Sequence, residues 1–158
     1  MKKSISALLA IVLLLCSVCT LASFNQDLIG NAKQALTLMS YGEYKKALKK
    51  LDLKGKTRAK DLATFVEEEL FDILSASVQS DVAAAFLKDE VWYVAVPVEP
   101  PSYDSVQTFV LRSKDGARFD TFKKMDWYEV ESMMDLSSQI IWQDAYEDGR
   151  LYAVPDAR

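Results

Sequence analysis

Residues 91–98, with the sequence VWYVAVPV, have the strongest β preference in this 158-residue chain because most of them are β-branched or aromatic. Apolar and polar residues hardly alternate in this stretch, which favours a strand that is at least partly covered on both faces. Pro97 has no amide hydrogen, so the end of the strand is expected at a sheet edge or a bulge. We therefore expect the neighbouring apolar segments to pack on this strand.

Further strand signals lie on both sides of this stretch. Asp89 and Glu90 form a turn before it, and a loop over residues 100–104 with two prolines follows it. Residues 113–116, with the sequence SKDG, are the clearest turn signal and predict a hairpin. The chain is thus expected to contain a four-stranded antiparallel meander, with strands over residues 82–88, 91–99, 105–112 and 117–124.

Helical spacing of apolar residues precedes the strands. We expect the first helix to be capped by Asn25 and the third by Thr57, and we expect Gly42 and Gly55 to end the first and second helices. The expected helices span residues 23–40, 43–53 and 57–80.

Helical spacing of apolar residues after the meander predicts a closing helix over residues 129–148. The helix propensity is weak around Ser137 and Ser138. Residues 151–158 are a short strand or a loose tail. Helices segregated from a meander predict an α+β domain, with N-terminal helices packed on a curved sheet. Whether the C-terminal segment is a helix or a strand stays open.

Residues 1–22 have a basic start, an apolar segment and small residues before a cleavage point near Ala22. This pattern predicts a cleaved signal peptide, followed by one exported domain over residues 23–158. The apolar segment is short for an uncleaved anchor, since a span needs about 20 residues. Both cysteines, Cys16 and Cys19, lie in the leader, and the large residues before them argue against a lipoprotein.

The net charge of −4 is unevenly distributed and argues against nucleic acid as the main partner. Residues 45–60 carry eight basic side chains against Asp52 alone, a local charge of +7. This stretch is either a solvated face or a surface for an anionic polymer or lipid. The candidate basic surface consists of Lys45, Lys46, Lys49, Lys50, Lys54 and Lys56.

Several chemistries lack their usual residues in this sequence. The chain has no histidine, the mature chain would have no cysteine, and the five glycines are isolated. We therefore expect no metal site, no cofactor and no catalytic triad or dyad. The acidic residues at 67–72 are expected to form a solvated face, because adjacent acids on a helix point in different directions. Those at 144–148 are expected to be a solvated cluster, because they lack the alternating oxygen spacing of a calcium loop.

The aromatic residues of the predicted sheet have two interpretations. They form the core of a small cysteine-free domain, or some of them line a pocket for an apolar or sugar-like ligand. The candidate pocket residues are Phe65, Trp92, Tyr93, Phe109, Phe122 and Trp127. Trp92 and Tyr93 are neighbours in a strand, so their side chains are expected on opposite faces.

Residues 35–48, which include the sequence YGEYKKAL at 41–48, resemble two known patterns. The first is the turn of a tetratricopeptide hairpin, but the motif occurs only once and such arrays need about three copies. The second is the opening of exported NTF2-like proteins, a resemblance that extends to the order of helices and strands. It implies helices that close a cone-shaped curved sheet whose mouth holds a ligand. The expected closing helix departs from that family, which continues its sheet there. The chain as a whole also resembles small exported proteins of Gram-positive bacteria.

The sequence thus favours an exported, non-enzymatic binding or interaction domain, whose partner is a small molecule, a protein or an anionic surface. One alternative is an NTF2-like enzyme that uses a buried carboxylate. Another is an inhibitor or structural protein that acts through its surface.

Overall fold

The computed structural model describes residues 23–70, 82–99 and 106–143. Its helices are α2 (Asp27–Ser40), α3 (Tyr44–Leu51), α4 (Ala59–Glu68) and α5 (Trp127–Met134). Its strands are β1 (Ala83–Lys88), β2 (Val91–Pro97), β3 (Gln107–Ser113), β4 (Thr121–Asp126) and β5 (Gln139–Gln143). The predicted α+β class is confirmed, with the longer helices preceding the sheet.

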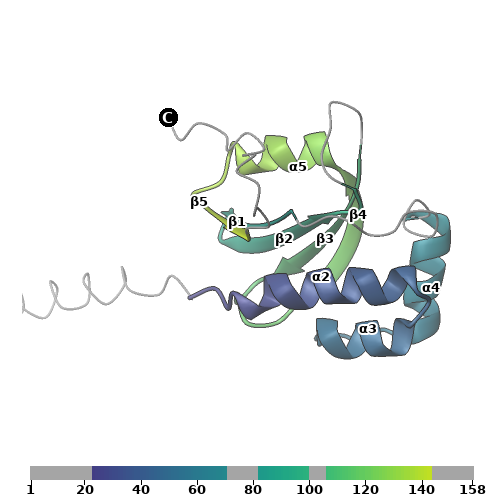
Figure 1. Ribbon diagram of the computed structural model, residues 1–158. Helices are drawn as coiled ribbons and strands as arrows, with labels where there is room; N and C mark the ends of the chain where they lie inside the picture. Colours follow the sequence, from purple (N-terminus) through teal and green to yellow (C-terminus); the bar gives the residue numbers. More distant parts are fainter. Residues whose placement is uncertain (1–22, 71–81, 100–105, 144–158) are drawn as a thin grey trace, which may run out of the picture.

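The described strands form one curved, open antiparallel sheet with the order β4-β3-β2-β1-β5 (Figure 1). The expected meander is confirmed as β1 to β4, and β2 lies in the middle of the sheet. Trp92 and Val94 pack into one core, whereas Ala95 packs into the other, so both faces of β2 are covered. Pairing of β2 with β1 ends at Ala95. Pro97 lies beyond this point, so β1 does not need an amide hydrogen from it.

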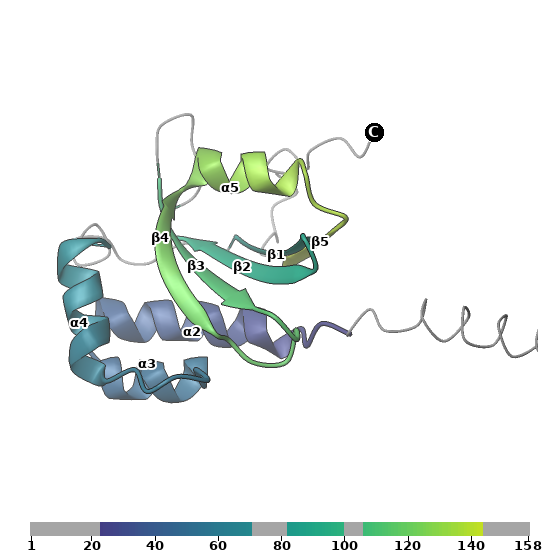
Figure 2. The same cartoon turned by 180° about the vertical axis from the view of Figure 1, so that it is seen from behind.

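Helices lie against both faces of the sheet (Figures 1 and 2). We call the side covered by α2 and α4 the α2 face, and the opposite side the α5 face. On the α2 face, α3 packs on the far side of α2, and α4 stands across the end of this helix pair. Within the described residues, the core of the α2 face is therefore shared by three helices, whereas the eight-residue helix α5 is the one helix that covers the α5 face.

Both predicted hairpin turns are present. Asp89 and Glu90 have φ values of 50° and 62°, the two consecutive positive angles that a two-residue type I′ turn requires. In the second turn Gly116 has a φ of 69°, and Asp115 Oδ1 accepts the amide hydrogens of Ala117 and Arg118. The following strand begins at Thr121, four residues later than expected, because residues 117–120 still belong to this connection.

The helix boundaries depart from the sequence prediction in several places. The left-handed residue that ends α3 is Asp52, with a φ of 42°, and not Gly55. The residue that caps α4 is Arg58, whose amide donates to Asp61, and not Thr57. At α2 the cap position is Gln26, although Asn25 Oδ1 accepts the amide hydrogen of Asp27.

The expected long third helix ends at Glu68 within the described residues, and the remainder of its predicted range up to residue 80 lies outside them. The predicted closing helix over residues 129–148 ends at Met134, and it is wrong over residues 139–143, which form β5. Ser138 leaves the helix and donates its amide hydrogen to Leu87 O, which aligns β5 beside β1. Ile140 and Ile141 then lie on opposite faces of the sheet, as strand alternation requires.

The leader at 1–22, the acidic residues at 71–72 and 144–148, and the tail at 151–158 lie outside the described residues. In the part of the chain that is described, no helix has the length and apolar character that crossing a membrane requires.

Candidate functional site

The candidate pocket aromatics are divided between the two faces of the sheet. Phe65, Phe109 and Phe122 meet on the α2 face, with ring centroids 4.8 to 6.0 Å apart. Trp92 lies on the same face, where its ring centroid is 4.5 Å from that of Phe24. These residues fill the space between helices and sheet, and Phe109 is fully buried.

The other two candidates, Tyr93 and Trp127, belong to the α5 face. The Tyr93 ring stacks on Phe86 with a centroid distance of 5.4 Å. Trp127 packs beside Trp142, and its indole Nε1 donates to Glu131 at 2.8 Å. The four candidates on the α2 face are thus part of the packed core or lie against it, whereas the charged side chains lie on the molecular surface.

The most strongly charged surface lies on α3. Ala47 and Leu51 of this helix are buried in the core, whereas the lysines on its other side are exposed. Two further exposed lysines follow, one before α4 and one in its first turn. We call this set the lysine face: Lys45, Lys46, Lys49, Lys50, Lys56 and Lys60.

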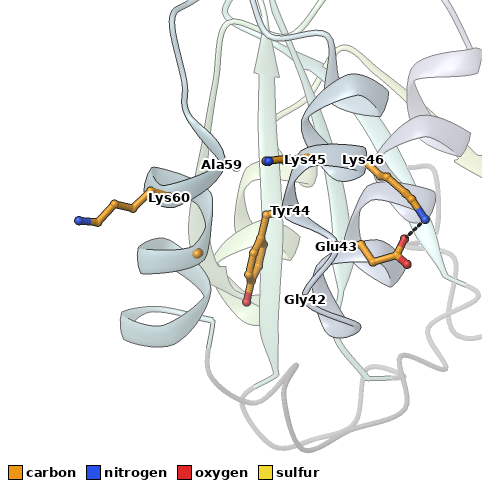
Figure 3. Close-up of a pocket in the computed structure, with 8 residues that line it drawn as sticks. Gly42, Glu43, Tyr44, Lys45, Lys46, Ala59 and Lys60 are labelled. Carbon is orange, nitrogen blue, oxygen red and sulfur yellow. Dashed lines mark ion pairs between the residues drawn. The ribbon is translucent and has the colours of Figure 1, made fainter.

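An open groove of about 450 Å³ lies between α3 and α4, beside the lysine face (Figure 3). The Tyr44 ring stands between the two helices, and Lys45 extends toward α4. Lys46 turns away and pairs with Glu43 at 2.8 Å, and Lys60 also points away from the groove. The groove is lined by Gly42, Glu43, Tyr44, Lys45, Lys46, Ala59, Lys60 and Ala63.

The electrostatics of the groove favour neutral Tyr44. Burial of the hydroxyl, and more weakly the negative charge of Glu67, raise the pKa of the Tyr44 phenol. The phenol therefore remains a hydrogen-bond donor in the groove at neutral pH.

Lys54 differs from the other predicted basic residues because its ion pairs join it to residues of a distant turn. Its Nζ lies 2.6 Å from Asp115 Oδ2 and 3.5 Å from Asp120 Oδ1. Next to it, Arg118 Nη2 lies 2.8 Å from Asp52 Oδ1. These contacts tie the α3–α4 connection to the turn between β3 and β4. Lys54 therefore serves to fix the position of the lysine face.

The start of α4 is fixed in a similar way. Arg58 donates to both carboxylate oxygens of Asp61, and this contact, with the Arg58 amide, lowers the pKa of the Asp61 carboxyl to about 2. Asp115 has its pKa lowered as well, first by Lys54 and then by the amides of Ala117 and Arg118. Both carboxylates stay charged over the physiological pH range, so both ends of the α3–α4 connection remain held.

The chain matches no known protein family, no curated protein and no solved structure. The site must therefore be interpreted from its own geometry.

Five of the six lysines predicted for the basic surface belong to the observed lysine face. Lys60 was missed as a site residue although it contributes to the local excess of positive charge over residues 45–60. Tyr44 was not among the predicted site residues, because the groove it occupies depends on the position of α4, which the sequence does not define. Among the described residues, no cluster of acidic side chains is arranged for a metal ion, and the buried polar residues are Thr108 and Ser113.

Proposed function

We propose that this protein is an exported, non-enzymatic binding domain that attaches through its lysine face to an anionic polymer of the cell surface. The observation that supports this most directly is the division of α3 into two sides. Its apolar side is buried against the rest of the domain, and its four lysines are exposed together with Lys56 and Lys60. Such a field of one sign attracts a polyanion over a distance comparable to the Debye length, about 8 Å at physiological ionic strength.

The burial of the apolar side of α3 favours a polymer over insertion into a lipid bilayer. Helices that lie in a membrane interface bury an apolar face among the lipids. In α3 that face consists of Ala47 and Leu51, which are already buried, and of Leu48, which is partly buried. Contact with anionic lipid would therefore rest on charge alone, at up to about 1 kcal/mol per lysine.

The fold also accords with the NTF2-like resemblance, because the chain returns to the sheet after α5 and adds β5 where that family continues its sheet. We propose on this basis that the chain is a distant relative of the NTF2-like proteins. The alternative of an NTF2-like enzyme requires a buried carboxylate, and none occurs in the residues that the structure describes.

The test is co-sedimentation of residues 23–158 with Gram-positive cell-wall fragments that retain their phosphate-bearing polymers. The variant Lys45→Gln/Lys49→Gln/Lys50→Gln should bind at least tenfold more weakly at 50 mM salt, because three charges of the lysine face are lost. The control Lys88→Gln/Lys114→Gln/Lys124→Gln removes the same charge elsewhere and should bind within threefold of the unmodified protein.

Two further binding measurements distinguish an anionic polymer from an anionic lipid as the partner. Fragments from which the anionic polymer has been stripped should lose binding, and vesicles with 30% phosphatidylglycerol should bind more weakly than intact fragments. Absence of binding at low salt, or equal losses for the two triple variants, would show that the lysine face is only a solvated surface.

A further inference from the structure

A second, smaller pocket of about 180 Å³ lies over the part of the sheet formed by β2, β3 and β4. Its position is distinct from the groove between α3 and α4, and the two share no lining residue. The pocket is lined by Tyr93, Val110, Arg112, Thr121, Phe122 and Lys123.

Strand register brings two cations together in this pocket. Arg112 on β3 lies directly between Tyr93 on β2 and Thr121 on β4. Two residues away on the same face of β3, Val110 is paired with Lys123. The Arg112 and Lys123 side chains therefore belong to adjacent cross-strand rows of the α5 face, close enough for one ligand to contact both.

These cations have no acidic partner among the described residues. Within that part of the chain, neither Arg112 nor Lys123 makes an ion pair, and none of its carboxylates lines the pocket. The Nε atom of Arg112 is buried and donates no hydrogen bond to the residues described. A buried donor without an acceptor is rare in folded proteins and calls for an explanation.

Apart from Thr121, the remaining walls of the pocket are apolar or aromatic side chains. Val110 is buried in the sheet, and the Tyr93 ring is held by stacking on Phe86, with an interplanar angle of 17°. The pocket thus combines an apolar wall with two positive charges, and its volume admits only a small molecule.

We propose that this pocket binds a small monocarboxylate with an apolar body. Arg112 rotates so that its Nε–H, which is buried in this structure, turns to the pocket and donates to one carboxylate oxygen, in the planar geometry that guanidinium groups use for carboxylates. Lys123 supplies the second positive charge, and the apolar body of the ligand lies along Val110 and the Tyr93 ring. This site is independent of the lysine face, which lies beyond α2 on the other side of the sheet.

The test is a titration of ¹⁵N-labelled residues 23–158 with benzoate, followed by ¹H–¹⁵N correlation spectra. Shift changes should centre on the amides of Tyr93, Arg112, Thr121 and Lys123. Arg112→Gln should weaken binding at least tenfold, and Lys123→Gln about threefold. Arg112→Lys keeps the charge but loses the planar donor, and should remain at least threefold weaker. The control Lys114→Gln removes an exposed charge from the nearby turn and should bind within twofold of the unmodified protein.

Other outcomes would overturn the proposal. Inorganic phosphate or benzyl alcohol that binds as tightly as benzoate would exclude selection for a carboxylate with an apolar body. Equal binding by Arg112→Gln and the unmodified protein would exclude Arg112 as the anchor. Shift changes in residues 144–158 caused by Arg112→Gln without added ligand would identify the partner as the chain's own carboxylates. Native-like spectra of each variant establish that a lost shift reports binding and not unfolding.

Discussion

The two faces of the sheet are built from alternate residues of the same strands, yet they differ in composition. On the α2 face, Val94 and Leu111 lie in one cross-strand row with Phe122, and helices cover it. On the α5 face, the neighbouring row contains Tyr93 and Arg112, which line an open pocket. The difference indicates that the α2 face provides most of the stability of the fold, while the α5 face keeps part of its surface available for a ligand.

The largest effect is expected on the α2 face. Phe109→Ala removes a fully buried ring that contacts both Phe65 and Phe122, and should lower the free energy of unfolding by about 4–5 kcal/mol. Urea denaturation followed by tryptophan fluorescence measures this change. A loss below about 1 kcal/mol would mean that this face does not form the main core.

A phenylalanine-to-alanine substitution on the α5 face, Phe86→Ala, tests whether the core of that face contributes less to stability. Phe86 is also fully buried, but its described neighbours are the Tyr93 ring beside the open pocket and the core under the short helix α5, which we expect to relax more easily into the vacated space. Phe86→Ala should therefore cost about 3 kcal/mol, less than Phe109→Ala under identical conditions. A larger loss for Phe86 would reverse the assignment of the dominant core.

A smaller effect is expected at the rim of the α2 face, where Lys54 pairs with Asp115. Because the pKa of Asp115 is lowered in the folded state, its contribution to stability is present above the unfolded pKa of about 3.9 and is lost as the pH falls toward the folded value. Asp115→Asn should therefore be less stable than the unmodified protein at pH 6, by less than either core variant.

This difference should shrink as the pH falls from about 4 to 2, as measured by the urea midpoint across this range. The asparagine side chain of this variant would keep an oxygen that can accept the two turn amides, so the comparison isolates the charge. A difference that is constant with pH would show that the Lys54 pair contributes nothing to stability.

The parts of the fold that depend on local sequence were predictable. The β-prone residues 91–98 and the SKDG turn specify the middle of the sheet and its second hairpin without reference to distant residues. Residues 139–143 were assigned to a helix because a short apolar segment fits both helical and strand spacing. Only pairing with β1, more than 50 residues earlier, decides in favour of a strand.

The candidate site also combines features that the local sequence predicts with features that depend on distant residues. The excess of lysine over residues 45–60 is visible in the sequence, and most of these side chains are exposed as expected. The separate role of Lys54 could not be predicted, because its partner Asp115 is 61 residues away. Arg112 gave no signal either, since its importance comes from the residues that strand register places beside it.

The position of β5 has a consequence for the order in which the chain can fold. The strands β1 to β4 pair with sequence neighbours, but the outer side of β1 acquires its partner only when residues 139–143 become available. Until then, the uncharged segment Ala83 to Leu87 presents an unpaired edge, the kind of strand that recruits other chains into aggregates. A nascent or truncated chain that ends before residue 139 should therefore be the form most in need of a chaperone.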